Sequence, residues 1–347
     1  MKRTRVITST ILLGMVVLIG ISVQAALGQP KTFSLKFASP NAPQNDQSKL
    51  WDWWAQELDK RTGGRVKTTM YHAGTLGSGP EVWENILKGI ADVGAIGPFT
   101  PGKHPVENHL TQILPFRIPS PRVTGEIFWN LYQKGLLNHE IGGYKFLYTQ
   151  PASLYILGTT KKKLTKLEDF KGLRIRVPGE SPTLKAFGVG IVASPPTELY
   201  SAIERGIVDG MVGGGSLIAS LKMEKLMKYV NIETWGAGNW YVCMNKKVWD
   251  SFPADIQAIL TTLNNETYQK DLEVVGNTDR RDLEIWKAAG ADVYRVEPAE
   301  LKRWKELTAN LMNDWVKEMD GKGLPGTQIK TEVLRVLREN GVDPEIR

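Results

Sequence analysis

The sequence has a single cysteine, Cys243, among its 347 residues, so the chain can form no internal disulfide. It also has only four histidines, His72, His104, His109 and His139, and no two of them have the i, i+4 spacing of a helical zinc site. Stability must therefore come from a large apolar core. We expect neither a metal site nor a bound cofactor.

Long apolar runs are also lacking, except at the start of the chain. Residues 11–23 are apolar, follow Lys2, Arg3 and Arg5, and precede small residues. This run is shorter than the roughly 20 residues that a membrane-spanning helix needs, and the pattern is typical of a secretory signal peptide. An uncleaved membrane anchor is the alternative. We predict a cleaved signal peptide at 1–28 and an exported mature chain.

The chain carries little excess charge of either sign. It has 44 basic and 37 acidic side chains, which gives a net charge of +7. Removal of the signal peptide takes away Lys2, Arg3 and Arg5 and leaves 41 − 37 = +4. This excess is too small to indicate nucleic-acid binding, and we interpret the basic run at 161–163 as a solvated turn.

The sequence lacks the motifs of the common catalytic sites. It has no G-x-S-x-G sequence, and the glycine run at 213–215 has no lysine of a phosphate-binding loop. Residues 188–193 match the dinucleotide pattern G-x-G-x-x-A, but a predicted helix precedes them and Pro195 and Pro196 follow. Because that motif must follow a strand and open a helix, we interpret the match as false. We expect no enzyme.

Short apolar strands alternate with amphipathic helices through the first part of the chain. Residues 33–38 and 65–71 alternate as half-buried strands do, and residues 91–97 form a continuous apolar strand. Helices are predicted between them, the second with Val82, Ile86 and Ile90 on one face. This order predicts an α/β fold with a largely parallel sheet.

A second unit of the same kind follows, with predicted strands at 155–159, 172–177, 190–193 and 208–212. We predict two similar α/β lobes with a hinge and a cleft, rather than one long sheet. A helix that opens at Pro253 and extends as far as Gly290 would span both lobes. The predicted division is lobe I at 31–150 plus about 236–277, and lobe II at 151–235 plus about 278–347.

The segment GLRIRVPG at 172–179 places two arginines in an alternating strand. A solvated edge strand and a site for an anion are both consistent with it. Arg174 and Arg176 project from the same face, but Arg176 lies nearer the carboxyl end, where open α/β sheets form their ligand crevice. A two-lobed exported body with a candidate anion site and no catalytic motif indicates a solute receptor.

Five stretches in order sharpen this interpretation: LKFASPNAP at 35–43, residues 57–102, LEDFKGLRIRVPG at 167–179, ELYSAIERGIVDGM at 198–211 and MNKKVWDSFPADIQ at 244–257. Together they resemble the solute-binding proteins of TRAP transporters, the DctP family, over about residues 31–320. The resemblance implies a fold like that of type II periplasmic binding proteins. It also implies a periplasmic receptor that closes on an organic anion and delivers it to a permease of two membrane subunits, driven by an ion gradient.

In that family, the second basic residue of the GL(K/R)(I/L)RV strand holds the substrate carboxylate, and here this residue is Arg176. The chain departs from the sialic-acid receptors of the family at 208–214, where it reads VDGMVGG and lacks their ligand-binding asparagine. We therefore expect an apolar pocket wall, although ordinary core packing stays open as the alternative for each of its residues: Phe99, Met211, Trp235 and Trp240. Loop candidates for polar or close backbone contact are Asn41, Gln44 and Gly97.

The expected partners are a small organic anion and the permease subunits, and we expect a monomer that binds no nucleic acid. The carboxylate itself is not predicted. A receptor of an ATP-driven importer and a secreted small-molecule enzyme remain the alternative functions.

Overall fold

The computed structural model describes residues 31–77, 79–97, 106, 110–177, 180–193, 196–214 and 221–343. The predicted signal peptide and Phe99 lie outside these residues. The first α/β unit consists of strands β1 (Phe33–Ala38), β2 (Val66–Tyr71) and β3 (Val93–Ile96), with helices α2 (Asp46–Arg61) and α3 (Gly79–Leu87) between them. β1 pairs in parallel with both β2 and β3, as the alternation of strands and helices predicts.

The second unit repeats this arrangement. Its parallel strands are β5 (Arg174–Val177), β6 (Gly190–Ala193) and β7 (Gly210–Gly214), and its helices are α7 (Pro182–Ala186) and α8 (Pro196–Glu204). Gly188 follows a helix and precedes a strand, which is the reverse of a dinucleotide-binding turn. The prediction of two similar α/β units is confirmed.

The two units match at the corner where a helix leads into a core strand. Gly89 and Gly206 have φ of +73° and +68°, a conformation that glycine adopts without strain. Three residues later, an aspartate accepts the backbone N–H of a neighbouring strand. The bonds run from Lys36 N to Asp92 Oδ2, 2.8 Å, and from Arg174 N to Asp209 Oδ2, 2.9 Å. Because α3 ends before its corner, Ile90 is 44% exposed and not on the buried face predicted for it.

Two long antiparallel strands join the units into one sheet. They are β4 (Tyr144–Thr159) and β8 (Tyr229–Asn245), and the strand order is β2-β1-β3-β8-β4-β7-β5-β6, with β9 (Asp292–Tyr294) paired to β8. The expectation of two separate lobes rather than one long sheet is wrong in this respect, because both strands continue from one half into the other.

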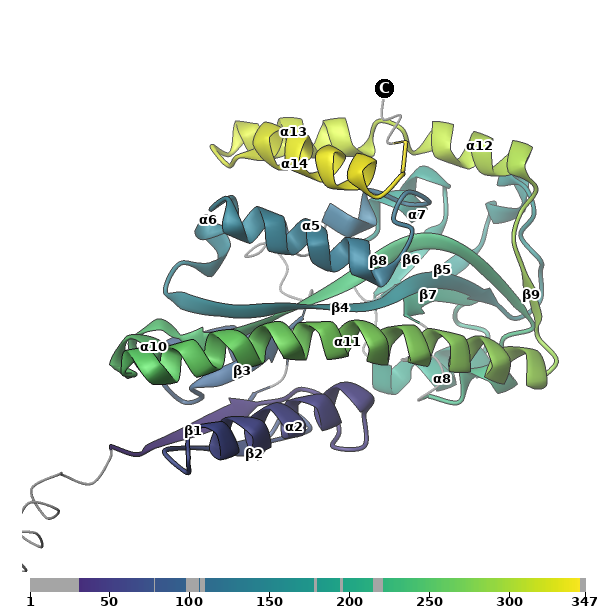
Figure 1. Cartoon of the computed structure of the whole chain (residues 1–347). Helices are drawn as coiled ribbons and strands as arrows, with labels where there is room; N and C mark the ends of the chain where they lie inside the picture. Colours follow the sequence, from purple (N-terminus) through teal and green to yellow (C-terminus); the bar gives the residue numbers. More distant parts are fainter. Residues whose placement is uncertain are drawn as a thin grey trace, which may run out of the picture.

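Helix α11 (Ala254–Ala288) spans both halves along β4, as predicted from Pro253 and Gly290 (Figure 1). Ile256 and Leu260 in its first half pack in a core with α2, whereas Trp286 near its end packs in a core of the second unit. Of the helices in the described ranges, none has the length and apolarity needed to cross a membrane.

The last two helices, α13 (Leu311–Gly321) and α14 (Gly326–Glu339), cover α5 (Pro121–Gln133), as Figure 1 shows. The predicted division puts residues up to 347 with the second lobe, whereas α13 and α14 pack in the core of the first half. The cause is an apolar stripe on α14, made by Ile329, Val333, Val336 and Leu337, which meets α5. The remaining elements are α6 (Asn138–Ile141), α10 (Lys246–Ser251), α12 (Pro298–Leu307) and short 3-10 turns at Leu110–Gln112, Leu167–Phe170 and Met223–Lys225.

Candidate functional site

Arg176 lies on β5 with its side chain inside the protein. Its exposed fraction is 1%, whereas the side chain of Arg174, two residues earlier, is 51% exposed. Arg174 donates a hydrogen bond to the carbonyl of Gly206 at 2.6 Å and lies beside the carboxylate of Asp209. The two arginines of the strand therefore occupy different environments, and only Arg176 is placed to act in a buried site.

Apolar side chains flank Arg176 on the neighbouring strands. Met211 of β7 and Val192 of β6 are its register partners, and side chains in register project from the same face of a sheet. Met211 is fully buried in a core to which Val192 also packs. Burial lowers the pKa of the Arg176 guanidinium, while the interaction with Tyr155 raises it. A guanidinium stays charged in proteins, so this position can hold a carboxylate in a fork of two hydrogen bonds.

Gly97 and Trp240 are brought together by the antiparallel pairing of β3 with β8. A Cβ atom added to Gly97 would lie 2.6–2.8 Å from three atoms of the Trp240 ring. The absence of a side chain at Gly97 therefore lets the indole ring lie against the backbone. Trp240 remains partly exposed, so part of its ring can contact a bound solute.

Trp235 has the surroundings of a core residue. It is 2% exposed, and its ring centroid lies 5.1–5.6 Å from those of four aromatic side chains: Phe116, Phe170, Phe187 and Trp304. Its indole N–H donates to Asn231 Oδ1 at 2.9 Å. Ordinary core packing, the alternative to a role in the pocket wall, therefore accounts for the contacts of Trp235. It accounts equally for those of the buried Met211.

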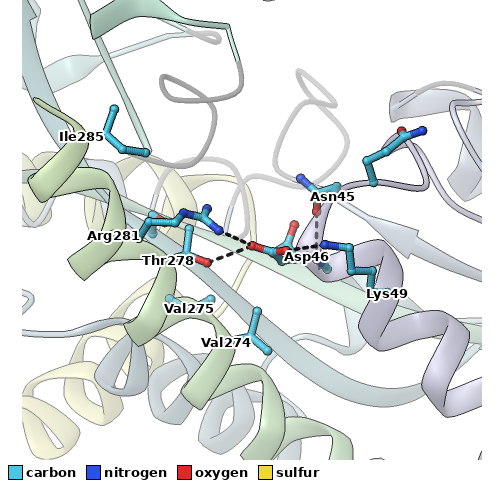
Figure 2. Close-up of a pocket in the computed structure, with 11 residues that line it drawn as sticks. Asn45, Asp46, Lys49, Val274, Val275, Thr278, Arg281 and Ile285 are labelled. Atoms are coloured by element: carbon cyan, nitrogen blue, oxygen red, sulfur yellow. Dashed lines mark hydrogen bonds and ion pairs between the residues drawn. The ribbon is translucent and has the colours of Figure 1, made fainter. Parts of the chain in front are cut away.

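A cavity of about 370 Å³ lies between the start of α2 and the second half of α11 (Figure 2). Gln44, one of the predicted loop residues, is part of its lining, whereas Arg176 is not. Asn41 lies in the preceding loop and donates to Gln47 Oε1 at 3.2 Å. The rest of the lining is Asn45, Asp46, Gln47, Lys49, Ser153, Val274, Val275, Thr278, Arg281 and Ile285.

An ion pair crosses this cavity. Figure 2 shows Arg281 and Thr278 of α11 pointing at Asp46 of α2, whose Oδ2 lies 3.0 Å from Arg281 Nη1 and 3.5 Å from Thr278 Oγ1. Burial raises the pKa of Asp46, but hydrogen bonds from Lys49 and Arg281 outweigh it and lower the pKa overall. No local pattern in the sequence singles out Asp46 or Arg281, which lie 235 positions apart.

The described residues contain no group of three or more His, Cys, Asp or Glu side chains that could hold a metal ion. The buried guanidinium of Arg176 with its apolar neighbours suits the binding of an organic anion, and the cavity between α2 and α11 offers polar side chains but does not include Arg176.

Comparison with known proteins shows the family to which this chain is similar. The sequence profile of the family described as bacterial extracellular solute-binding protein, family 7 (DctP), matches residues 37–318. The chain is 22% identical over 333 residues to the C4-dicarboxylate-binding periplasmic protein DctP of Rhodobacter capsulatus, which covers 88% of this chain and 92% of that relative.

The fold is similar to those of two solved structures. One is a TRAP solute-binding protein from a marine metagenome, specific for aromatic acid ligands and crystallised with 3-hydroxybenzoate. It has a TM-score of 0.80 and 20% identity, over 89% of this chain and 99% of that one. The other is a TRAP solute-binding protein from Rhodoferax ferrireducens in complex with benzoate, with a TM-score of 0.78 and 22% identity, over 89% and 98% of the two chains.

Proposed function

The chain belongs to family 7 of the bacterial extracellular solute-binding proteins, and from this we propose that it is the periplasmic receptor of a TRAP transporter. In this role it captures an organic acid and delivers it to the permease subunits in the membrane. The receptor binds its solute without converting it. Cleavage of the signal peptide at 1–28 and action as a monomer are parts of the same proposal.

The observation that carries the proposal is the burial of Arg176 on β5 beside Met211 and Val192. Placing a charged group among apolar side chains is costly, and a carboxylate that accepts two hydrogen bonds from the guanidinium offsets this cost. We assign Arg176 as the anchor of the substrate carboxylate. Closure of the two halves around the bound acid would exclude water from this contact.

The proposed solute is a carboxylate with an apolar or aromatic body. The partly exposed ring of Trp240, held against Gly97, supplies apolar surface, and the buried Met211 beside Arg176 stays a candidate for the wall. Gln44 and Asn41 would supply polar contacts from the first half. Phe99 and Trp235 stay candidates for the wall, although the aromatic contacts of Trp235 favour a packing role.

A thermal-shift screen of organic acids, followed by calorimetry, tests this proposal. The panel includes benzoate, 3-hydroxybenzoate, a C4-dicarboxylate and a 2-oxo acid. A tight ligand in large excess stabilises the folded protein by about 3–4 kcal/mol. Mass spectrometry after incubation should recover the acid unchanged, and conversion of the acid would instead identify an enzyme.

The variant Arg176→Ala should lose about 3–5 kcal/mol of binding free energy, because the buried carboxylate loses its partner. This loss is at least a hundredfold in Kd. Arg176→Lys should also bind poorly, since an ammonium cannot reproduce the planar fork. The matched control is Arg174→Ala, on the same strand but exposed, which should leave Kd unchanged. Equal affinities of Arg176→Ala and the wild type would refute the assignment.

A further inference from the structure

Gln150 of β4 and Asp271 of α11 form a hydrogen-bonded pair that is wholly buried. Both residues have an exposed fraction of 0%, and Gln150 Nε2 donates to Asp271 Oδ1 at 2.9 Å. Carboxylates are almost never fully buried unless they are paired with a cation. Within the described part of the chain, Asp271 has no ion pair with a basic side chain, and its hydrogen bond to the neutral Gln150 is what opposes its burial.

The carboxyl group of Asp271 and the amide group of Gln150 each have an oxygen that lacks a hydrogen-bond donor in the described ranges. Asp271 Oδ2 and Gln150 Oε1 are both buried, and neither has a hydrogen-bond partner among the described residues. If Asp271 is ionised, both atoms are acceptors, and the only donor of the pair is the Gln150 amide nitrogen, which already donates to Asp271 Oδ1 and cannot donate to its own Oε1. If Asp271 is protonated, its O–H can donate to Gln150 Oε1, and the acid and the amide then form a reciprocal pair of hydrogen bonds. One proton therefore satisfies both atoms.

The other titratable groups around Asp271 leave its charge uncompensated. Tyr148 faces it from β4 and Tyr268 from α11 itself, and burial raises the pKa of Tyr148 well above its usual value and that of Tyr268 to about 12. Both phenols therefore stay neutral at physiological pH. Burial in turn raises the pKa of Asp271 to about 8, against the opposing effect of the hydrogen bond from Gln150.

The pair lies where the two halves of the protein meet. Gln150 directly precedes the stretch of β4 in which the register with β8 shifts, between Pro151 and Leu154. Asp271 lies midway along α11, between the part that packs with α2 and the part that packs in the second unit. The hydrogen bond thus ties the helix to the strand at the crossing between the halves.

We propose that Gln150 and Asp271 form a buried proton-binding site that joins α11 to β4 at the crossing between the halves and makes this joint sensitive to pH. With the proton bound, the joint is a neutral pair with two hydrogen bonds. Loss of the proton leaves a buried charge opposite an amide oxygen and weakens the joint. This inference does not depend on which solute Arg176 binds.

The sign of the pH effect follows from the two states of Asp271. An unfolded aspartate has a pKa of about 3.9, whereas in the folded protein it is about 8. The folded state therefore holds a proton that the unfolded state releases between these values. Below about pH 4 Asp271 contributes fully to the stability of the folded state. Between about pH 4 and pH 8 the unfolding constant rises by up to tenfold for each pH unit. Above about pH 8 the ionisation of Asp271 changes it no further.

The variant Asp271→Asn tests the proposal because its amide reproduces the protonated acid. Asn Oδ1 still accepts from Gln150, and Asn Nδ2 donates to Gln150 Oε1. In thermal unfolding from pH 4 to 9, the variant should match the wild type at about pH 4 and become progressively more stable than it towards pH 8. The matched control is Glu273→Gln, on the exposed face of the same helix, which should follow the wild-type curve.

Infrared difference spectra of the wild type minus Asp271→Asn give a readout that does not depend on stability. The carbonyl band of a protonated carboxyl should be present at pH 7 and disappear around pH 8. The wild type titrated alone should show the same band even if the variant folds poorly. Absence of the band at pH 7, or a stability difference between variant and wild type that does not change with pH, would show an ionised Asp271 and overturn the proposal.

Discussion

Gly97→Ala is the sharpest test of the contact between Gly97 and Trp240. The added methyl group would lie 2.6–2.8 Å from three atoms of the indole ring, whereas ordinary contact begins at 3.4 Å. The ring must therefore recede by about 0.6–0.8 Å, and it belongs to β8, which is paired on both sides. Forcing an extra methyl into such packing costs about 1–3 kcal/mol. We expect this loss of stability, together with weaker binding of the acid found in the thermal-shift screen if Trp240 forms the pocket wall.

The comparison with Gly213→Ala makes this measurement decisive. There the added Cβ meets only Met211 Cε, at 3.1 Å, and this methyl group at the end of a flexible side chain can move. The loss should be below about 1 kcal/mol. Differential scanning calorimetry gives both stabilities, and titration with the acid found in the thermal-shift screen gives both affinities. If the two variants lose equal stability, the indole ring is not fixed by Gly97, and the reasoning is refuted.

Two further predictions concern ion pairs. A double-mutant cycle with Asp46→Asn and Arg281→Gln should give a coupling of only about 0.2–1 kcal/mol, because both side chains are partly exposed, and a coupling that persists in 1 M salt would contradict this. Glu332 is 3% exposed, and hydrogen bonds from Arg335 and Lys134 lower its pKa against the effect of burial. Its stabilisation is therefore present above about pH 4.3 and lost as the pH falls below that. Glu332→Gln should cost about 1.5–3 kcal/mol at pH 7 and give a flatter thermal-unfolding profile between pH 5 and 3, whereas a profile parallel to the wild type would argue against this role.

Local signals in the sequence predict most helices and the short parallel strands. The start and end of α11 follow from Pro253 at its first turn and Gly290 just beyond its last residue, and both signals act within one turn of helix. The length of β4 could not be predicted in the same way, because Pro151 and the irregular pairing after it interrupt the alternation. This strand exists through its pairing with β8, which lies far away in the sequence.

In the candidate site, too, contacts between residues far apart in the sequence could not be predicted. The position of Arg176 near the carboxyl end of its strand predicts which arginine is buried, but the strand pattern alone places Arg174 and Arg176 on the same face. The difference arises from neighbours on β6 and β7. The ion pair of Asp46 and Arg281 in the cavity cannot be predicted from the sequence around either residue, because each is an ordinary charged residue on an amphipathic helix.

The continuity of β4 and β8 limits how the closure proposed above could take place. Two paired strands and one long helix cross between the halves, so the proposed closure would bend the strands, and the register shift between Pro151 and Leu154 is one of three irregular points at which they could bend. Such irregularities bend and twist a strand more readily than regular pairing does. Buried hydrogen bonds lie beside this point, from Thr149 to Asn239 at 2.6 Å and from Gln150 to Asp271 at 2.9 Å. Under the proposed closure, weakening either of them should change the balance between open and closed states without any change at Arg176.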